Sequence, residues 1–520
     1  MENTREKNKR SDGRKKTYFD RENKKKAVRI EKTKSVAPEK GKQKKSSSSS
    51  KCPYQKKCGG CTYLNLSYEE QLAKKEQFLK KTLKGIVPVK GMVGMENPYH
   101  YRNKVNSAFA RKKDGTIISG IYEKGTHKVV PVDECLLEDQ RADAIIRDIR
   151  SLLKSFKIMI YNEDSGYGLL RHVMVRTGFA SGEIMVVLVC VSPVFPSKNN
   201  FVKALRKLHP EITTIVLNVN DRTDSMVLGK RDIVLFGRGY IEDELCGCTF
   251  RISPQSFYQV NPVQTQKLYE KALEYAGLEG NETVWDLYCG IGTISLFLAQ
   301  KAKQVYGVEI VPAAIEDAKR NATLNHITNA EFFVGKAEEV LPEKYEKEGI
   351  YADVIVVDPP RKGCEESVLA TMVKMQPKRI VYVSCDSATL ARDLKYLRGE
   401  GYEVKKVQGV DQFPHTVHVE TVCLLSKLNA KQHIEVDIHM DELDLTDAEK
   451  KATYSEIKEY VLEHTGLKVS SLYIAQVKQK CGIIERENYN KPKSDDAKQP
   501  QCPPDKEKAI KEALKHFGMI

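Results

Sequence analysis

Val284-Trp-Asp-Leu-Tyr-Cys-Gly-Ile-Gly292 joins a short apolar run to two closely spaced glycines. The run is too short for a helix and rich in β-branched and aromatic residues, so it predicts a buried strand with a helix after the glycines. Strand and helix then alternate, with strands expected at 304–309, 332–334, 354–358 and 380–383, and closing strands at 402–407 and 419–426. This alternation predicts an α/β region with a doubly wound parallel sheet and helices on both faces.

The glycine loop has the features of a nucleoside pocket. In open α/β sheets ligands bind beyond the carboxyl ends of the strands, and glycines there let a cofactor approach the backbone. Glu309 ends the next strand, where an acid can bond ribose hydroxyls, and Asp358 ends a later strand at the expected pocket floor. The loop lacks the third glycine of the dinucleotide fingerprint and the lysine of a P-loop. S-adenosylmethionine therefore fits better than a nucleotide polyphosphate.

Cys385 falls where the expected strand at 380–383 stops, and Ser387 is expected to cap the helix that follows. A thiol at the carboxyl end of a strand is placed like a nucleophile. A lone cysteine is also often a small buried apolar side chain. The cofactor loop, Asp358 and a carboxylate at Glu420 favour the nucleophile.

Two further motifs flank this region. Phe257-Tyr-Gln-Val-Asn261 offers a ring for stacking and an amide for polar contacts, although ordinary packing explains it equally well. Asp358-Pro-Pro-Arg-Lys-Gly363 resembles the loop used for adenine amine methylation, except that Arg361 replaces the aromatic residue. In the stretch 413–420, His415, His418 and Glu420 suggest a metal site, but a carboxylate acting as a base is more useful beside a cysteine.

Three cysteines stand close together near the start of the globular region, at Cys52, Cys58 and Cys61, with two glycines between the last pair. The spacing and the tight turns that glycine permits suit a small metal centre. Zinc and an iron–sulfur cluster both fit, and each needs a fourth ligand. Cys135 is the nearest cysteine downstream.

Charge is concentrated at the N-terminus. Residues 1–51 hold 19 Lys and Arg against 7 Asp and Glu, which accounts for +12 of the net charge of +15. Basic tails of this kind are usually disordered and often touch nucleic acid. No apolar run is long enough for a membrane span and no secretory signal is recognisable, so we expect a cytoplasmic protein whose thirteen cysteines are thiols or ligands.

The composition predicts four regions. Residues 1–51 form the basic tail, and residues 52–250 form a central α+β domain that carries the cysteine centre. Within the central domain, the helix expected at 67–84, with a capping box of Ser67 and Glu70, is expected to pack on the next domain. Residues 251–428 form the α/β domain, and residues 429–520 form a charged helical extension with a helix pair at 454–464 and 472–480.

Together these motifs resemble the bacterial RNA uracil-C5-methyltransferases, which use S-adenosylmethionine to modify ribosomal or transfer RNA. The resemblance covers residues 52–428 and rests on the order C-x5-C-G-G-C, F-x-Q-V-N, D-x-x-C-G-x-G, D-P-P-R, S-C and H-T-x-H-x-E. It implies a class I methyltransferase fold and, as in the ribosomal branch, a four-cysteine [4Fe-4S] cluster.

The resemblance also implies residue roles. Cys385 matches the nucleophile and Glu420 the general base. The matched cofactor positions are Gln259, Tyr288, Glu309 and Asp358, the matched cluster ligands are Cys52, Cys58, Cys61 and Cys135, and the candidate RNA contacts are Phe257 and Arg361.

The expected target is 23S rRNA, modified by a monomer that needs neither DNA nor a membrane. Methylation of tRNA uracil or of RNA cytosine at carbon 5, and a non-catalytic assembly factor that binds RNA, are the alternatives. Members of the ribosomal branch often carry a small RNA-binding β-barrel before the cysteines, where this chain has the basic tail. The tail can supply salt-sensitive affinity but no recognition of shape.

Overall fold

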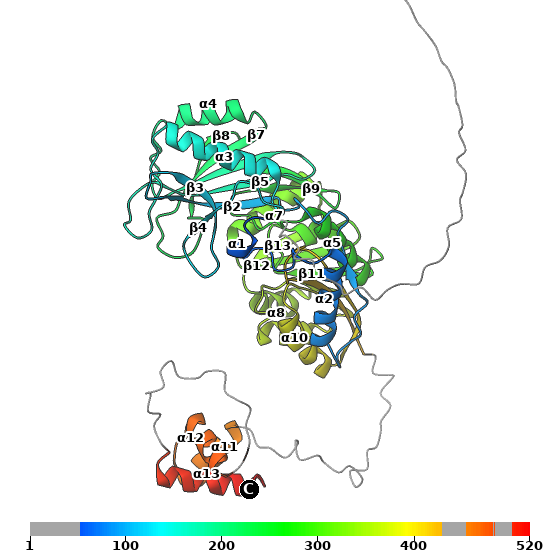
Figure 1. The fold of residues 1–520 in the computed structure, drawn as a ribbon. Helices are drawn as coiled ribbons and strands as arrows, with labels where there is room; N and C mark the ends of the chain where they lie inside the picture. Colours follow the sequence, from blue (N-terminus) through cyan, green and yellow to red (C-terminus); the bar gives the residue numbers. More distant parts are fainter. Residues whose placement is uncertain (1–51, 429–453, 482, 484–501) are drawn as a thin grey trace, which may run out of the picture. The chain divides into compact units, whose positions relative to one another are not determined.

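The computed structural model describes residues 52–428, 454–481, 483 and 502–520 (Figure 1). The expected basic tail at 1–51 lies outside the described residues, as do residues 429–453 of the expected helical extension. The chain divides into two compact units, Met1–Leu428 and Asn429–Ile520, which are described separately.

The first unit contains an eight-stranded sheet in the order β1-β16-β17-β15-β14-β11-β12-β13. Neighbouring strands are parallel, except that β17 is antiparallel to both β15 and β16. The strands expected from the alternating pattern are therefore confirmed. They are β11 (Thr283–Leu287), β12 (Gln304–Glu309), β13 (Ala330–Val334), β14 (Val354–Val357), β15 (Arg379–Ser384), β16 (Tyr402–Val410) and β17 (Glu420–Lys427). The edge strand β1 (Met92–Val93) is additional to the expected strands.

The expectation of a purely parallel sheet is wrong at β17. A parallel crossover needs about a dozen residues and usually contains a helix. Only residues 411–419 join β16 to β17. The chain therefore turns back, and β17 inserts between β15 and β16, with Thr421 paired to Ser384 and Glu420 paired to Val410.

Helices cover both faces of this sheet, as expected. Successive strand residues point to opposite faces, so Val284 packs in one core and Trp285 in the other, both fully buried. Helix α5, which follows the loop that contains Phe257, is additional to the helices expected from the alternation of strands and helices. The first core is covered by α5 (Pro262–Ala276), α6 (Thr293–Ala299) and α7 (Pro312–Leu324), and the second by α2 (Tyr68–Thr82), α8 (Ala337–Glu348), α9 (Glu366–Met375) and α10 (Ser387–Gly399).

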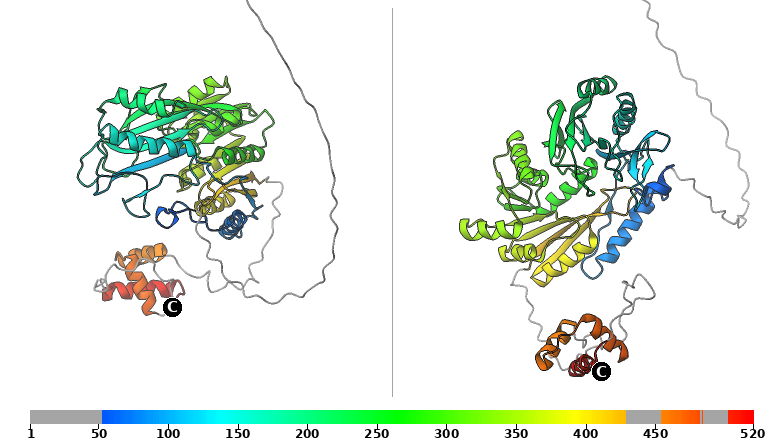
Figure 2. Two further views of the ribbon diagram at one scale, coloured as in Figure 1. Left: turned by 45° about the horizontal axis from the view of Figure 1, so that its top comes forward. Right: turned by 90° about the vertical axis from the view of Figure 1, so that its left-hand side faces the viewer.

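The N-terminal helix α2 packs beside α10 and β1, next to the yellow α/β layer in the right-hand view of Figure 2. The expected capping box is confirmed, because the Ser67 hydroxyl accepts from the amide of Glu70 and the Glu70 carboxylate accepts from the amide of Ser67. The buried face of α2 includes Lys75, which is 1% exposed. Its ammonium donates to Asp411 at 2.5 Å and to the carbonyl of Phe413 at 3.0 Å.

A second, seven-stranded sheet forms the central region in the order β4-β3-β2-β5-β6-β7-β8. Its elements are β2 (Lys104–Arg111), β3 (Ile117–Tyr122), β4 (Val129–Pro131), α3 (Gln140–Ser155), β5 (Leu170–Thr177), β6 (Ile184–Cys190), α4 (Lys198–Leu208), β7 (Ile212–Val219) and β8 (Arg231–Phe236), and the short helix α1 (Gln55–Cys58) precedes them. Helices α3 and α4 cover one face (Figure 1), where Val173 and Val175 are buried. Met174 and Met185 on the other face share a core with the α/β layer. The hairpin β9 (Ile241–Leu245) and β10 (Cys248–Ile252) leads into that layer.

The second unit contains three described helices, α11 (Tyr454–Thr465), α12 (Ser471–Lys480) and α13 (Pro504–His516). The expected pair at 454–464 and 472–480 corresponds to α11 and α12, while α13 is additional. Ile457, Ile474 and Ile510 are fully buried and bring the three helices to one small core. In neither unit do the described helices include one long and apolar enough to cross a membrane.

Replacing Lys75 with methionine is expected to lower the free energy of unfolding by about 3–5 kcal/mol, because the buried Asp411 carboxylate would lose its cation. Chemical denaturation of the full-length protein measures this. Lys80→Met on the same helix is the control, since Lys80 is 56% exposed and its pair with Glu76 should contribute less than about 1 kcal/mol. Equal effects of the two substitutions would contradict the stabilising role of the buried pair.

Candidate active site

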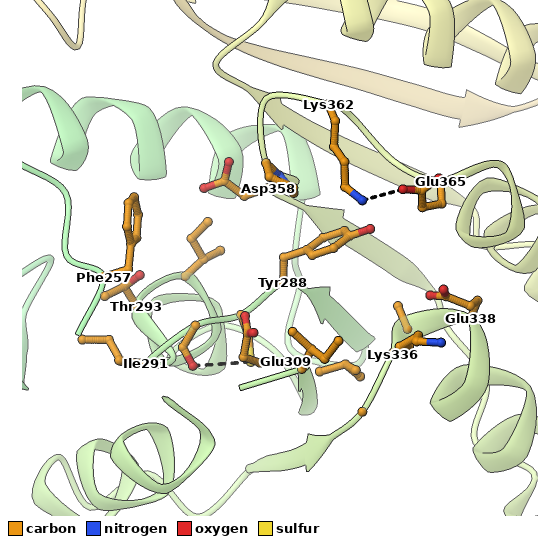
Figure 3. Close-up of a pocket in the computed structure, with 18 of the residues that line it drawn as sticks. Phe257, Tyr288, Ile291, Thr293, Glu309, Lys336, Glu338, Asp358, Lys362 and Glu365 are labelled. Atoms are coloured by element: carbon orange, nitrogen blue, oxygen red, sulfur yellow. Dashed lines mark hydrogen bonds and ion pairs between the residues drawn. The ribbon is translucent and has the colours of Figure 1, made fainter. Parts of the chain in front are cut away.

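A cavity of about 780 Å³ opens at the carboxyl ends of β11, β12, β13 and β14. Parallel strands bring these ends to one edge of the sheet, so residues far apart in sequence line one hollow. Figure 3 shows Tyr288 crossing the middle of the cavity, with Asp358 on one side, Glu309 on another and Phe257 facing them from a separate loop. The predicted cofactor residues Tyr288, Glu309 and Asp358 therefore meet.

The loop after β11 has an unusual backbone. Tyr288 has φ 68°, and Gly290 and Gly292 have φ 56° and 83°. A left-handed conformation costs a tyrosine free energy, and the neighbouring packing must hold it there. A side chain on Gly292 would lie 3.2 Å from the Cβ atom of Ala318. The sequence motif thus corresponds to a tight turn that leaves the backbone open to a ligand.

The charges around the cavity suit a cationic nucleoside better than a polyphosphate. Lys336 forms an ion pair with Glu339 at 2.9 Å, and Lys362 forms one with Glu365 at 2.5 Å. Each lysine therefore already has a counter-ion. One Glu309 oxygen accepts from the amide of Val311 at 3.0 Å. Burial raises the pKa of Asp358 to about 6. These observations fit the ribose hydroxyls and the sulfonium of S-adenosylmethionine.

Asp286 lies beneath this loop and is fully buried. One carboxylate oxygen accepts from the Ser295 hydroxyl at 2.5 Å, and the other has no hydrogen-bond partner among the described residues. Burial raises the pKa of Asp286 to about 7. Asp286 does not line the cavity, so its buried carboxyl supports the glycine loop from below.

Gln259, the fourth predicted cofactor residue, does not line the cavity. It is half-buried, and its backbone carbonyl accepts a hydrogen bond from the side-chain amide of Asn103 at 3.2 Å. Phe257, two residues earlier, is 71% exposed and does line the cavity. The motif therefore places the Phe257 ring at the cavity, whereas Gln259 is not part of the cavity lining.

Cys385 and Glu420 face each other through strand register. Ser384, the last residue of β15, pairs with Thr421 of β17. Cys385 follows Ser384 and Glu420 precedes Thr421, so the two lie opposite one another at the end of the ladder. Asp358 ends the adjacent strand β14 and interacts electrostatically with both. The thiol is half-buried and the Glu420 side chain is 3% exposed.

The electrostatics of this group correct one expectation. A nucleophilic thiol is expected to have a lowered pKa, yet burial, Glu420 and Asp358 raise the pKa of Cys385 to about 11, against a smaller opposing effect of Arg361. Burial and then Asp358 raise the pKa of Glu420 to about 8. At neutral pH, without ligands, both groups therefore hold their protons.

Two local interpretations near Cys385 also change. Asp386, not Ser387, caps α10, because its carboxylate accepts from the amides of Ala388 and Thr389. His415 is 2% exposed, its backbone amide donates to the side-chain oxygen of Gln71 at 3.0 Å, and its ring stacks on Tyr99. His415 thus helps to dock the loop before Glu420, which weakens the alternative of a histidine metal site.

The loop at 411–419 is held by residues that the sequence motifs did not identify. Lys75 and Gln71 reach it from α2, and the Tyr101 hydroxyl donates to the carbonyl of Pro414 at 3.1 Å. These contacts could have been anticipated from the sequence, because a lysine and a glutamine on the buried side of an amphipathic helix need polar partners at positions that are normally apolar. This docking fixes the chain that enters Glu420.

Four cysteines line a second, small cavity of about 40 Å³ in the central region, namely Cys52, Cys58, Cys61 and Cys135. Apolar side chains such as Leu64 and Ile121 complete its wall. The structure thus brings the predicted fourth thiol to the other three. Across the described ranges, no three or more His, Cys, Asp or Glu side chains are close enough to hold a single metal ion.

The geometry agrees with comparisons to known proteins. The model of the tRNA (uracil-5-)-methyltransferase family matches residues 67–428, which is more than half of the chain. The chain belongs to this family. RNA methyltransferases named as uncharacterized in Bacillus cereus and Clostridium tetani are 50% and 49% identical over 382 and 385 residues. These matches cover 72% and 73% of this chain and 83% of each relative.

A solved structure supports the same assignment. The Pyrococcus abyssi tRNA (uracil-54, C5)-methyltransferase in complex with S-adenosyl-L-homocysteine is 30% identical, with a TM-score of 0.59. The match covers 70% of this chain and 85% of that one. This member of the RNA uracil-C5 methyltransferase family therefore has a mixed α/β, S-adenosylmethionine-dependent methyltransferase fold. Family membership also favours an enzyme over a non-catalytic assembly factor.

Glu420→Gln is expected to stabilise the protein at high pH. The pKa of Glu420 rises from 4.5 to about 8, so its contribution to stability is present below pH 4.5 and lost as the pH rises through 8. The neutral glutamine avoids that loss. Thermal melting should show a gain on the order of 1–3 kcal/mol at pH 9 and almost none at pH 5. Exposed Glu403→Gln on β16 is the control, and a pH-independent gain for Glu420→Gln would contradict the expectation.

Proposed function

We propose that this enzyme methylates carbon 5 of a uridine in 23S rRNA through a covalent bond between Cys385 and carbon 6 of the base. The observation that carries the proposal is the register of β15 and β17, which sets Cys385 opposite Glu420. Asp358 links this pair to the cofactor cavity, because it lines the cavity and interacts electrostatically with both residues.

Four residues are proposed to hold the cofactor: Gln259, Tyr288, Glu309 and Asp358. Glu309 is suited to the ribose hydroxyls, and the Tyr288 ring can pack on the bound molecule. S-adenosylmethionine supplies the electrophilic methyl group, and its sulfonium charge opposes the carboxylates that hold the pKa of Cys385 high. Gln259 must turn toward the cavity to take part, since it lies behind Phe257.

Cys385 is the proposed nucleophile. Carbon 5 of uracil is a weak nucleophile, and addition of the thiolate to carbon 6 forms an enolate that makes carbon 5 reactive. The half-buried thiol must first lose its proton to solvent, and the nearby Arg361 favours the thiolate. After methylation, Glu420 accepts the proton from carbon 5, the double bond re-forms and the Cys385 thiolate is expelled. Glu420 must therefore be ionised at that step.

The RNA must bring a single base to this buried pair. A uracil in a helix cannot reach Cys385 unless it is unstacked and turned out of the strand. Phe257, which is 71% exposed beside the cavity, offers a surface on which an opened strand can stack. Arg361 is the second proposed RNA contact. The P. abyssi neighbour is named for a tRNA substrate, so tRNA uracil is the second candidate target, and RNA cytosine is the third.

Trapping on 5-fluorouridine RNA tests the proposal. Fluorine at carbon 5 cannot leave as a proton, so 23S rRNA transcribed with 5-fluorouridine should form a stable adduct with the wild-type enzyme and S-adenosylmethionine, and none with Cys385→Ala. Glu420→Gln should form the adduct with ordinary uridine RNA and release it at least about 100-fold more slowly. Denaturing electrophoresis and peptide mass spectrometry locate the bond.

A fluorinated tRNA pool and RNA with 5-fluorocytidine serve as parallel substrates. Adduct formation with tRNA alone would show that the substrate is tRNA and not 23S rRNA. Adduct formation with 5-fluorocytidine RNA alone would show that the methylated base is cytosine and not uracil. Methyl transfer by Cys385→Ala would overturn the covalent mechanism.

We also propose that Cys52, Cys58, Cys61 and Cys135 hold a [4Fe-4S] cluster. A zinc ion needs four sulfurs about 2.3 Å from one point, whereas a cluster binds each cysteine at a separate corner. The four thiols line one shared, largely apolar cavity, which brings all four proposed ligands to one place. Burial is the largest cause of the raised pKa values of Cys61 and Cys135, both about 12, so metal binding must supply the charge that ionises them.

Anaerobically purified protein is therefore expected to be brown and to contain about four irons per chain, measured by absorption spectra and metal analysis. Cys61→Ser should lose the colour and the iron, whereas Cys423→Ser, at a buried cysteine in β17, should keep both. Stoichiometric zinc in colourless wild-type protein would refute the cluster.

A further inference from the structure

A lysine without a counter-ion lies beside the loop that carries Phe257. Lys104 begins β2 and is the cross-strand partner of Arg176 on β5, so the two side chains share one face of the sheet. Lys104 is half-buried. Among the described residues, no hydrogen bond or ion pair reaches its ammonium group.

The two neighbouring cations differ in their contacts. Arg176 is 3% exposed, and its guanidinium donates to the carbonyls of Pro254, at 3.3 Å, and Ser256. Arg102 interacts electrostatically with Glu138. Lys104 thus belongs to a group of three positive charges, of which Arg176 already binds the backbone of the Phe257 loop.

The group borders the route to the catalytic pair. Arg176 binds the backbone just before Phe257, and Asn103 binds the backbone of Gln259 and Val260 just after it. Tyr101, three residues before Lys104, contacts the loop that leads to Glu420. Lys104 does not line the cofactor cavity. The group that it completes lies beside the Phe257 loop, outside the cofactor cavity.

An unpaired ammonium in this place is costly. Burial, Arg176 and Arg102 together lower the pKa of Lys104 to about 8. Like charges brought together in a half-buried place destabilise the folded chain unless an anion joins them. RNA carries one phosphate per nucleotide, and a lysine is a point charge suited to a phosphate.

We propose that Lys104, supported by Arg102 and Arg176, binds a backbone phosphate of the substrate RNA next to the nucleotide that enters over Phe257. This inference rests on the proposed RNA uridine substrate. Arg176 cannot replace Lys104, because its guanidinium already binds the backbone of the Phe257 loop.

Lys104→Met in the full-length protein tests the phosphate site, with Lys104→Arg as the conservative variant. The control is Lys207→Met, an exposed lysine on α4 at the opposite face of the same sheet. Binding of transcribed 23S rRNA without cofactor is measured over a series of salt concentrations. We expect Lys104→Met to weaken binding about tenfold and to reduce the salt slope by about one, because one phosphate contact is lost. Lys104→Arg and Lys207→Met should keep both values near those of the wild type.

Two further readouts separate binding from structure. KM for RNA should rise in Lys104→Met, while kcat and KM for S-adenosylmethionine stay within about twofold. The melting temperature should stay the same or increase, because the substitution removes a like-charge contact. A lower melting temperature with weakened binding that arginine does not restore would show a structural role and overturn the proposal, as would unchanged affinity and salt slope.

The binding assay is independent of the chemistry. Wild-type protein that binds the transcript with a salt slope sensitive to Lys104, yet forms no 5-fluorouridine adduct, would leave the phosphate site intact and overturn the proposed reaction. If the adduct forms normally but RNA binding does not depend on Lys104, the proposed reaction would stand and the phosphate site would be overturned.

Discussion

The antiparallel pairing of β17 with β15 is the constraint on which the candidate active site depends. A one-residue slip of this ladder would turn the buried side chains of β17 to the opposite faces and carry Glu420 away from Cys385. Val422 and Cys423 are fully buried in opposite cores, so the packing of both faces fixes the register. The proposed catalytic pair is therefore positioned by apolar residues that take no part in the proposed chemistry.

The same burial that fixes the geometry sets the charge state. Glu420, Asp358 and Cys385 lie in a poorly solvated group, which raises the pKa of each. Two carboxyls and a thiol cannot all ionise there without added positive charge. In the proposed reaction, the positive charge that the substrates bring therefore determines when the Cys385 thiol can ionise and attack.

Much of this arrangement can be predicted from local sequence. The strands from β11 to β16, the glycine turn and the acids at Glu309 and Asp358 follow from patterns within a few residues. The orientation of β17 could be anticipated only by noting that residues 411–419 are too few for a crossover. The buried Lys75, the position of Gln259 behind Phe257 and the raised pKa of Cys385 could not, because they depend on partners far away in the chain and on desolvation.

The ion pair between Lys75 and Asp411 joins residues 336 positions apart in sequence. During synthesis α2 emerges early, but the loop that satisfies its buried lysine and glutamine emerges only near the end of the α/β region. Until then the helix carries a charge that it cannot bury, while the central sheet between them can already pair its own strands. The buried polar side chains of α2 therefore tie its docking to the 411–419 loop, and the contact between this helix and that loop can form only after most of the α/β region has been synthesised.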